Sequence, residues 1–154
     1  MSEISVSTLG LNRRHFASSV VEGLYTLSSA TKGTIGVKLY VQLVGGAASA
    51  TSPDVQDPDG TFGEVKFCIQ RDNGDLWWNQ VRPVETNWQF VALFACLLDG
   101  RCIFWKVPRE SLIQLIGFGD GHVGTRELKE IRIRGAQIES VLGPYLQSEH
   151  RFVP

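Results

Sequence analysis

Apolar residues recur at helical spacing near the start of the chain, just after Asn12, a residue that can cap a helix. This pattern predicts a helix over residues 13–30, which ends at Lys32-Gly33. Residues 35–44 (IGVKLYVQLV) alternate instead and are rich in β-branched side chains, so they predict a strand. The small residues at 45–52 (GGAASATS) then predict a loop.

Two tight turns organise the middle of the chain. Asp57-Pro58-Asp59-Gly60 lies between two predicted strands, residues 54–56 and 62–69. Asp99-Gly100 separates two strongly apolar runs, residues 88–98 and 101–107, which is typical of a β-hairpin.

The other segments are predicted from shorter patterns. Residues 76–81 (LWWNQV) are interpreted as a short helix, and Pro108 begins a second helix over residues 108–116. A loop at 117–124 precedes a predicted strand at 129–134 (KEIRIR). Together the elements indicate an α/β (α+β) fold with a mixed central β-sheet flanked by helices, in a single domain of residues 1–154.

The amino-acid composition gives little indication of a binding partner. Hydrophobic residues make up 43% of the chain and charged residues 20%, which is ordinary for a globular protein. The formal net charge of −1 is a mild argument against a nucleic-acid partner, because such proteins usually carry a basic excess. The longest apolar run, residues 90–98, is about half of a membrane span, and residues 1–14 contain no secretory signal. We therefore expect a cytoplasmic protein without a membrane partner, and three buried, reduced cysteines.

The candidate chemistry lies in residues 52–69, SPDVQDPDGTFGEVKFCI. Residues two apart on a strand point to the same face, so Glu64 and Lys66 project together while Val65 faces the core. The predicted hairpin folds Asp54 back alongside Glu64. Two carboxylates and one ammonium group are thereby expected at one point on the sheet.

This set of side chains suits the hydrolysis of a phosphodiester bond. Mg²⁺ prefers oxygen ligands and commonly binds one or two carboxylates together with substrate phosphate and water. Asp54, Glu64 and the carbonyl of Val65 are candidate metal ligands, with Mn²⁺ as a substitute metal. Lys66 is expected to hold the attacking water and to offset developing charge.

Pro53-Asp54, followed after residues 55–63 by Glu64-Val65-Lys66, resembles the motif of the PD-(D/E)XK nuclease superfamily, which includes many restriction endonucleases, resolvases and repair nucleases. The resemblance covers residues 16–107 as an order of elements. It implies a restriction-endonuclease-like fold and a Mg²⁺-dependent DNA endonuclease, with type II restriction-like activity as the first candidate. Asp54, Glu64 and Lys66 would be catalytic in such an enzyme, with Glu22 of the first helix as an accessory residue.

Other interpretations of the same segment stay open. The hairpin can be a surface feature with a solvated Glu–Lys pair. It can also belong to a non-catalytic nucleic-acid-binding or assembly module on a nuclease-like fold, or to a domain that binds a small molecule or a protein without metal. Pro58-Asp59 offers a rival motif, but it lies close to Glu64 and its acid falls in the turn.

Further contacts with DNA are predicted outside this motif. Lys129, Arg132 and Arg134 are interpreted as one basic face of a strand that contacts phosphates, although an edge strand also carries such charges. His122 is a candidate contact in a glycine-rich loop. Gln80 is a candidate polar neighbour of the active site.

Cutting both strands of DNA needs two active sites, which predicts a homodimer with both sites on one shared groove. Trp77, Trp78 and Trp88 are interpreted as an apolar patch that a second copy would bury. The alternative is that these tryptophans complete the core of a single chain.

Overall fold

The protein is described from a computed structural model, which places residues 2–12, 19–51, 53–81, 87–115 and 129–154, with the backbone alone for residues 80, 113 and 129. The strands are β1 (Ser2–Ser5), β2 (Ala47–Ala48), β3 (Val55–Gln56), β4 (Phe62–Ile69), β5 (Leu76–Val81), β6 (Phe90–Cys96), β7 (Arg101–Pro108), β8 (Lys129–Ile133) and β9 (Leu146–Val153). The helices are α1 (Val20–Tyr25), α2 (Ser29–Leu43), α3 (Arg109–Leu115) and α4 (Ile138–Leu142), with short 3-10 turns η1 (Val6–Leu9), η3 (Gly135–Gln137) and η4 (Gly143–Tyr145).

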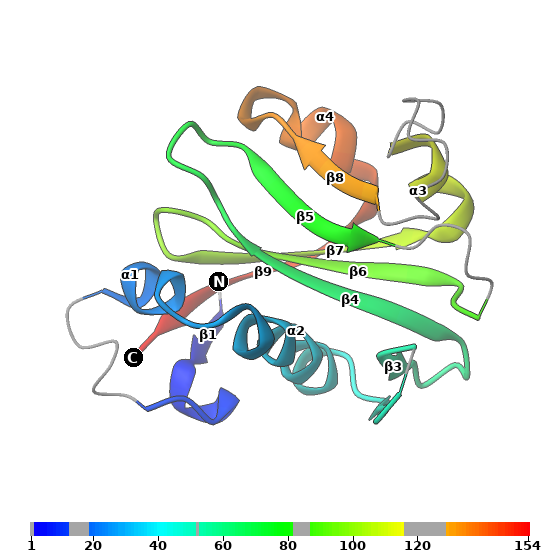
Figure 1. The fold of residues 1–154 in the computed structure, drawn as a ribbon, viewed down its shortest axis with the longest axis horizontal. Coiled ribbons are helices and arrows are strands. Elements are labelled where there is room, and N and C mark those ends of the chain that lie inside the picture. The colour runs from blue at the N-terminus through cyan, green and yellow to red at the C-terminus, as the bar shows by residue number, and fades with distance from the viewer. Residues whose placement is uncertain (1, 13–18, 52, 82–86, 116–128) are drawn as a thin grey trace.

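The described chain forms a seven-stranded mixed sheet in the order β1-β9-β7-β6-β4-β3-β2, together with a two-stranded sheet of β5 and β8. The pairs β1–β9 and β4–β6 are parallel, and the other pairs are antiparallel. Figure 1 shows α1 and α2 below the large sheet, and β5, β8, α3 and α4 above it. The predicted mixed sheet with flanking helices is confirmed.

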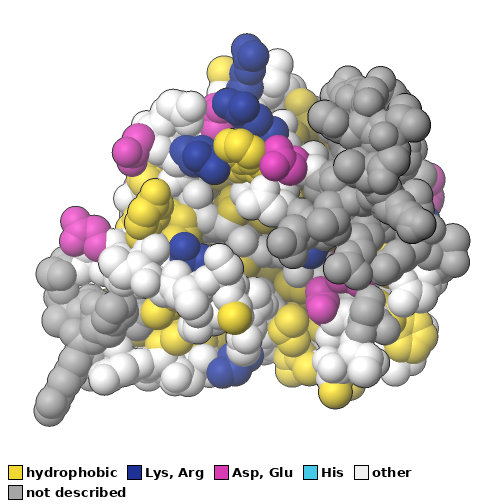
Figure 2. All heavy atoms as spheres, in the orientation of Figure 1, with side chains coloured by type: hydrophobic (Ala, Val, Ile, Leu, Met, Phe, Trp, Pro, Cys, Tyr) yellow, Lys and Arg dark blue, Asp and Glu magenta, His cyan; other side chains and the backbone are white. Residues whose placement is uncertain are grey.

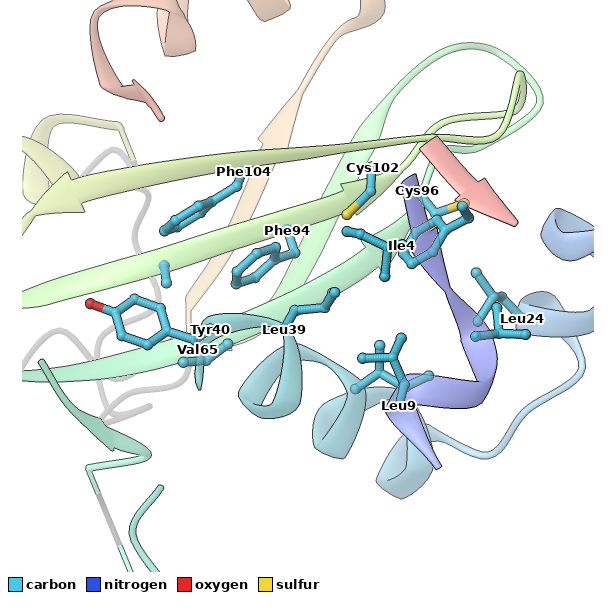
Figure 3. Close-up of a cluster of buried hydrophobic side chains, with 14 of the residues drawn as sticks. Ile4, Leu9, Leu24, Leu39, Tyr40, Val65, Phe94, Cys96, Cys102 and Phe104 are labelled. Atoms are coloured by element: carbon cyan, nitrogen blue, oxygen red, sulfur yellow. The ribbon is translucent and has the colours of Figure 1, made fainter. Parts of the chain in front are cut away.

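Each face of the large sheet has its own hydrophobic core. The first core lies between the large sheet and the helices α1 and α2. It contains stacked Phe94 and Phe104, whose ring centroids are 4.5 Å apart (Figure 3). The second core lies between the sheet and the β5–β8 layer, and it contains Trp78 and Trp88, each 1% exposed. The expected apolar patch of three exposed tryptophans is therefore wrong, and the alternative that they complete the core of the chain holds for these two.

Residues 35–44 were predicted as a strand, but residues 35–43 belong to the helix α2 and Val44 follows it. Ser28 begins this helix, because its Oγ accepts a hydrogen bond from the Thr31 amide. The buried residues Ile35, Gly36, Leu39 and Tyr40 share one face of a helix, since they recur one and four positions apart. The helix also runs through Lys32-Gly33, which was predicted to end an earlier helix. Of that earlier prediction, residues 20–25 are helical in α1, and residues 13–18 lie outside the described residues.

Gly36 is a poor helix former, but α2 tolerates it because it packs closely against β4. A Cβ atom at this position would lie 3.0 Å from Val65 Cγ1 and 3.4 Å from Phe67 Cβ. The missing side chain lets the helix backbone pack directly on β4. The close approach outweighs the cost of about 1 kcal/mol that glycine adds inside a helix.

Residues 76–81, interpreted as a helix, form the strand β5. Leu76 and Trp78 are buried while Trp77 between them is only half-buried, which is the alternation of a strand. Trp78 Nε1 also donates a 2.9 Å hydrogen bond to the carbonyl of Phe94 and anchors β5 on the large sheet.

Both predicted tight turns are present. The amide of Gly60 donates to the carbonyl of Asp57 at 2.9 Å, and the amide of Gly100 donates to the carbonyl of Leu97 at 2.9 Å. Both glycines have φ near +90°, which side chains disfavour. The strands predicted at 62–69, 88–98, 101–107 and 129–134 and the helix at 108–116 correspond to β4, β6, β7, β8 and α3. The strands β1, β2 and β9 were not predicted, and β2 lies within the segment 45–52 that was predicted as a loop.

The cysteines are free and buried, as expected. Burial raises the pKa of the Cys68 and Cys96 thiols to about 12, so they stay protonated at neutral pH.

Within the described ranges, no helix is long and apolar enough to cross a membrane.

A buried polar group at the edge of the first core joins three separate elements. Asp57, in the β3–β4 turn, accepts hydrogen bonds from the hydroxyl of Tyr40 on α2 and from Lys106 Nζ on β7, the latter at 3.0 Å. Burial raises the pKa of the Asp57 carboxyl, but the hydrogen bonds from Tyr40, the Asp59 amide and Lys106, together with the charge of Lys106, outweigh it and lower the pKa to about 2. Lys106 Nζ also lies 4.3 Å from the centroid of the Phe90 ring.

The first prediction concerns acid stability. The pKa of Asp57 falls from its ordinary 3.8 to about 2, so its contribution is present above pH 3.8 and is lost as pH falls through about 2. The expected contribution is on the order of 2 kcal/mol. In urea unfolding at pH values on either side of this window, Asp57→Asn should lose less stability on acidification than the wild type does. Glu139→Gln, which alters an exposed acid on α4, should behave like the wild type. Equal acid sensitivity of the wild type and Asp57→Asn would contradict the prediction.

Candidate functional site

The β3–β4 hairpin determines where the predicted catalytic residues Asp54, Glu64 and Lys66 lie. Val55 pairs with Gly63 and Gln56 pairs with Phe62, so extending the register by one residue sets Asp54 opposite Glu64. Val55 and Val65 are buried in the first core. Strand alternation therefore directs Asp54, Glu64 and Lys66 to the opposite face of the hairpin, where all three are half-buried.

Asp54 is also fixed to the edge of β4. Its Oδ2 accepts a 2.9 Å hydrogen bond from the amide of Val65. In the described part of the chain, β4 has no strand partner on this side beyond Gly63, whereas its other side pairs with β6 as far as Ile69. The carboxylate thus satisfies a backbone donor that no strand reaches.

A pocket of about 740 Å³ lies along this unpaired edge. Its walls are the N-terminal half of α2, the edge of β4 and the outward side of β5. Asp54, Val65 and Lys66 line the pocket, and Glu64 is not among the lining residues. The volume falls in the range of sites that hold one small molecule or one unit of a polymer.

The charged residues of the pocket are mostly basic. Lys32, Lys66 and Arg71 line it together with one acid, Asp54, which leaves an excess of two positive charges. Hydroxyl and amide groups are interspersed among them, from Ser29, Thr34 and Asn79. Such a wall favours an anionic ligand with several oxygen acceptors, and a phosphate is the commonest ligand of this kind.

Trp77 lies on β5 and lines the pocket, and two arginine side chains lie near its ring. The guanidinium carbon of Arg71 lies 4.0 Å from the centroid of its ring, and that of Arg132 lies 5.1 Å from it. Arg132 also pairs with buried Asp75 at 3.4 Å, and Asp75 accepts a hydrogen bond from the amide of Gly135. Figure 2 shows basic side chains gathered around a hydrophobic side chain at the top of the view.

The other predicted residues lie outside the pocket or outside the described residues. Glu22 is exposed on α1 and does not line the pocket. Arg132 on β8 and Arg134 directly after β8 are exposed and alternate with buried Ile131 and Ile133. The side chains of Lys129 and Gln80 are not described, and His122 lies outside the described residues.

The pocket residues that were not predicted from the sequence include Lys32, Arg71 and Tyr25. Lys32 was interpreted as the end of a helix, and Arg71 and Tyr25 were not singled out. Their shared location depends on α2 packing across β4, which the strand prediction for residues 35–44 concealed. The helical recurrence of Ile35, Gly36, Leu39 and Tyr40 was the one signal that could have shown it.

Among the residues that the structure describes, no three His, Cys, Asp or Glu side chains form a metal-binding group. A metal at this hairpin would therefore have at most two carboxylate ligands from these residues. That number matches the usual protein contribution to a Mg²⁺ site that also binds substrate phosphate.

Comparison with known proteins assigns no family, since no family model and no curated protein matches this sequence.

The second prediction separates the structural role of Asp54 from its charge. Asp54→Asn keeps a carbonyl oxygen that can accept from the Val65 amide, whereas Asp54→Ala removes the acceptor. Asp54→Ala should lower the free energy of unfolding by about 1 kcal/mol, and Asp54→Asn should leave it nearly unchanged. Thermal and urea unfolding measure both. If the two variants are equally destabilised, the contact with Val65 does not hold the hairpin edge.

Proposed function

We propose that this protein is a Mg²⁺-dependent nuclease that hydrolyses phosphodiester bonds of DNA, on a restriction-endonuclease-like arrangement of helix, hairpin and sheet. The observation that carries the proposal is the placement of Asp54, Glu64 and Lys66 on one face of the β3–β4 hairpin, beside a pocket with an excess of positive charge. Cleavage of the restriction type is the first form of this activity to test.

The donors at the hairpin fit Mg²⁺. Asp54 and Glu64 occupy neighbouring positions on adjacent strands and offer carboxylate oxygens. The N–H and C=O of one strand residue point to the same side, so the carbonyl of Val65 faces the pocket edge as its amide does. These three groups would hold the ion, which when bound would neutralise phosphate charge and lower the pKa of a water molecule.

The remaining residues of the pocket receive the substrate. Lys66 shares the face of the two carboxylates, where its ammonium group orients the attacking water and offsets charge that develops on the phosphate. Lys32 on α2 and Arg71 after the end of β4 line the same pocket and contact the backbone phosphates of the bound strand.

A second candidate is a nucleic-acid-binding module without catalysis. The basic excess of the pocket favours it, because three cations bind phosphate without any metal. Asp54 and Glu64 are adjacent carboxylates, which repel a phosphate unless a cation lies between them, so their pairing favours a metal-dependent enzyme. We therefore prefer the nuclease; a resolvase or a repair nuclease would use the same chemistry.

The homodimer stays a prediction. Its support from exposed tryptophans is removed, because Trp78 and Trp88 are buried in the second core. The requirement for two active sites in double-strand cleavage is what still favours it.

The third prediction tests the chemistry. Asp54→Asn, Glu64→Gln and Lys66→Ala should each lower the rate of plasmid cleavage in Mg²⁺ by about a thousandfold or more, which corresponds to about 4 kcal/mol of transition-state stabilisation. Excess chelator should abolish cleavage by the wild type. Gel analysis of nicked and linear plasmid gives the rate.

Glu139→Gln is the matched control, because it changes an exposed acid on α4, away from the pocket. It should cleave like the wild type. Unchanged cleavage in chelator, or by Lys66→Ala, would refute the proposed mechanism.

A further inference from the structure

An exposed aromatic side chain stands at the rim of the basic pocket. Tyr25, the last residue of α1, is 67% exposed, the highest value among the described large hydrophobic residues. It lines the same pocket as Lys32, Lys66 and Arg71. A single exposed aromatic residue is ordinary on a protein surface, but here it adjoins three cations in one pocket.

Tyr25 is held in place by Lys32. The Lys32 ammonium donates a 3.2 Å hydrogen bond to the carbonyl of Tyr25 and lies 5.4 Å from the centroid of its ring. Both residues flank the junction between α1 and α2, where Ser28 and Ser29 begin the second helix. The cation and the ring thus lie next to each other, and the exposed Tyr25 side chain stays accessible to a ligand.

We propose that this pocket binds one unpaired nucleotide of single-stranded DNA, with its base stacked on Tyr25 and its phosphates against Lys32, Lys66 and Arg71. The inference rests on the proposed function and narrows the DNA substrate of that same pocket to a strand with unpaired nucleotides, in place of the duplex that restriction-type cleavage would act on. Aromatic rings bind single strands by stacking on bases, and neighbouring cations track the phosphates.

Two observations favour a single strand over a duplex. A base inside a duplex is covered on both faces by its neighbours, so an exposed ring at a pocket rim can stack only on a base that has left the helix. A duplex-binding protein neutralises many phosphates over a broad basic surface. This chain has a formal net charge of −1, and an excess of two positive charges is concentrated in one pocket.

The fourth prediction tests this pocket in chelator, so that binding is measured without cleavage. Fluorescence anisotropy with a short labelled oligodeoxythymidylate reports the dissociation constant. Tyr25→Ala should weaken binding about tenfold, within the usual effect of losing one aromatic–base stack. Tyr25→Phe should bind like the wild type, because it keeps the stacking ring. Leu146→Ala, which truncates a side chain 45% exposed on β9, is the control and should have no effect.

Two further probes separate the base from the phosphates. An abasic oligomer with the same number of phosphates should bind more weakly than the thymidylate and should not respond to Tyr25→Ala. Arg71→Gln should weaken the binding of both oligomers. A duplex of matched length that binds as tightly as the single strand, or equal binding by Tyr25→Ala and Tyr25→Phe, would overturn the inference.

The two proposals fail separately. If neither plasmid DNA nor a single-stranded oligomer is cut in Mg²⁺ but the single strand binds with the stated dependence on Tyr25, the nuclease is refuted and the binding pocket stands. If cleavage depends on Asp54 and Lys66 while Tyr25→Ala changes neither binding nor cleavage, the nuclease stands and the single-strand pocket is refuted.

Discussion

The carboxylate of Asp57 is the contact on which the arrangement of the hairpin depends. It lies in the β3–β4 turn and receives hydrogen bonds from Tyr40 on α2 and Lys106 on β7, so one side chain holds the hairpin, the helix and the sheet together. A buried carboxylate is tolerated only when its partners compensate for lost water, and three donors do so here. The position of Asp54, three residues earlier, follows from this anchorage.

The hairpin therefore divides its acids between two tasks. Asp57 faces the first core and accepts three hydrogen bonds, whereas Asp54 lies at an edge of β4 that no described strand covers, where the Val65 amide donates to one of its oxygens. Glu64 stands across the ladder from Asp54. In the proposed nuclease, a buried anchor next to a half-buried edge would keep the geometry of the site constant while its carboxylates remain accessible.

Local patterns predicted the hairpins well and the pocket poorly. β4 follows from its alternation, and both turns follow from glycines that need positive φ. Residues 35–44 misled because β-branched residues favour strands, while the decisive factor was the contact of Gly36 with Val65, a tertiary effect that propensity does not contain. In β5, the alternation of Leu76 and Trp78 was present but short. Lys32 and Arg71 are far apart in sequence, and only the packing of α2 on β4 brings them together.

The path of β5 also has a consequence for how the chain folds. β4 and β6 are parallel neighbours, yet the strand between them in sequence crosses over the face of the sheet and pairs with β8. The β6–β7 hairpin closes through a short local turn and can form early, whereas the β4–β6 ladder must wait for a long crossover. Distant pairings of this kind slow folding. We therefore expect the hairpin of β6 and β7 to be the nucleus, and the edge that carries Asp54 and Lys66 to be completed last.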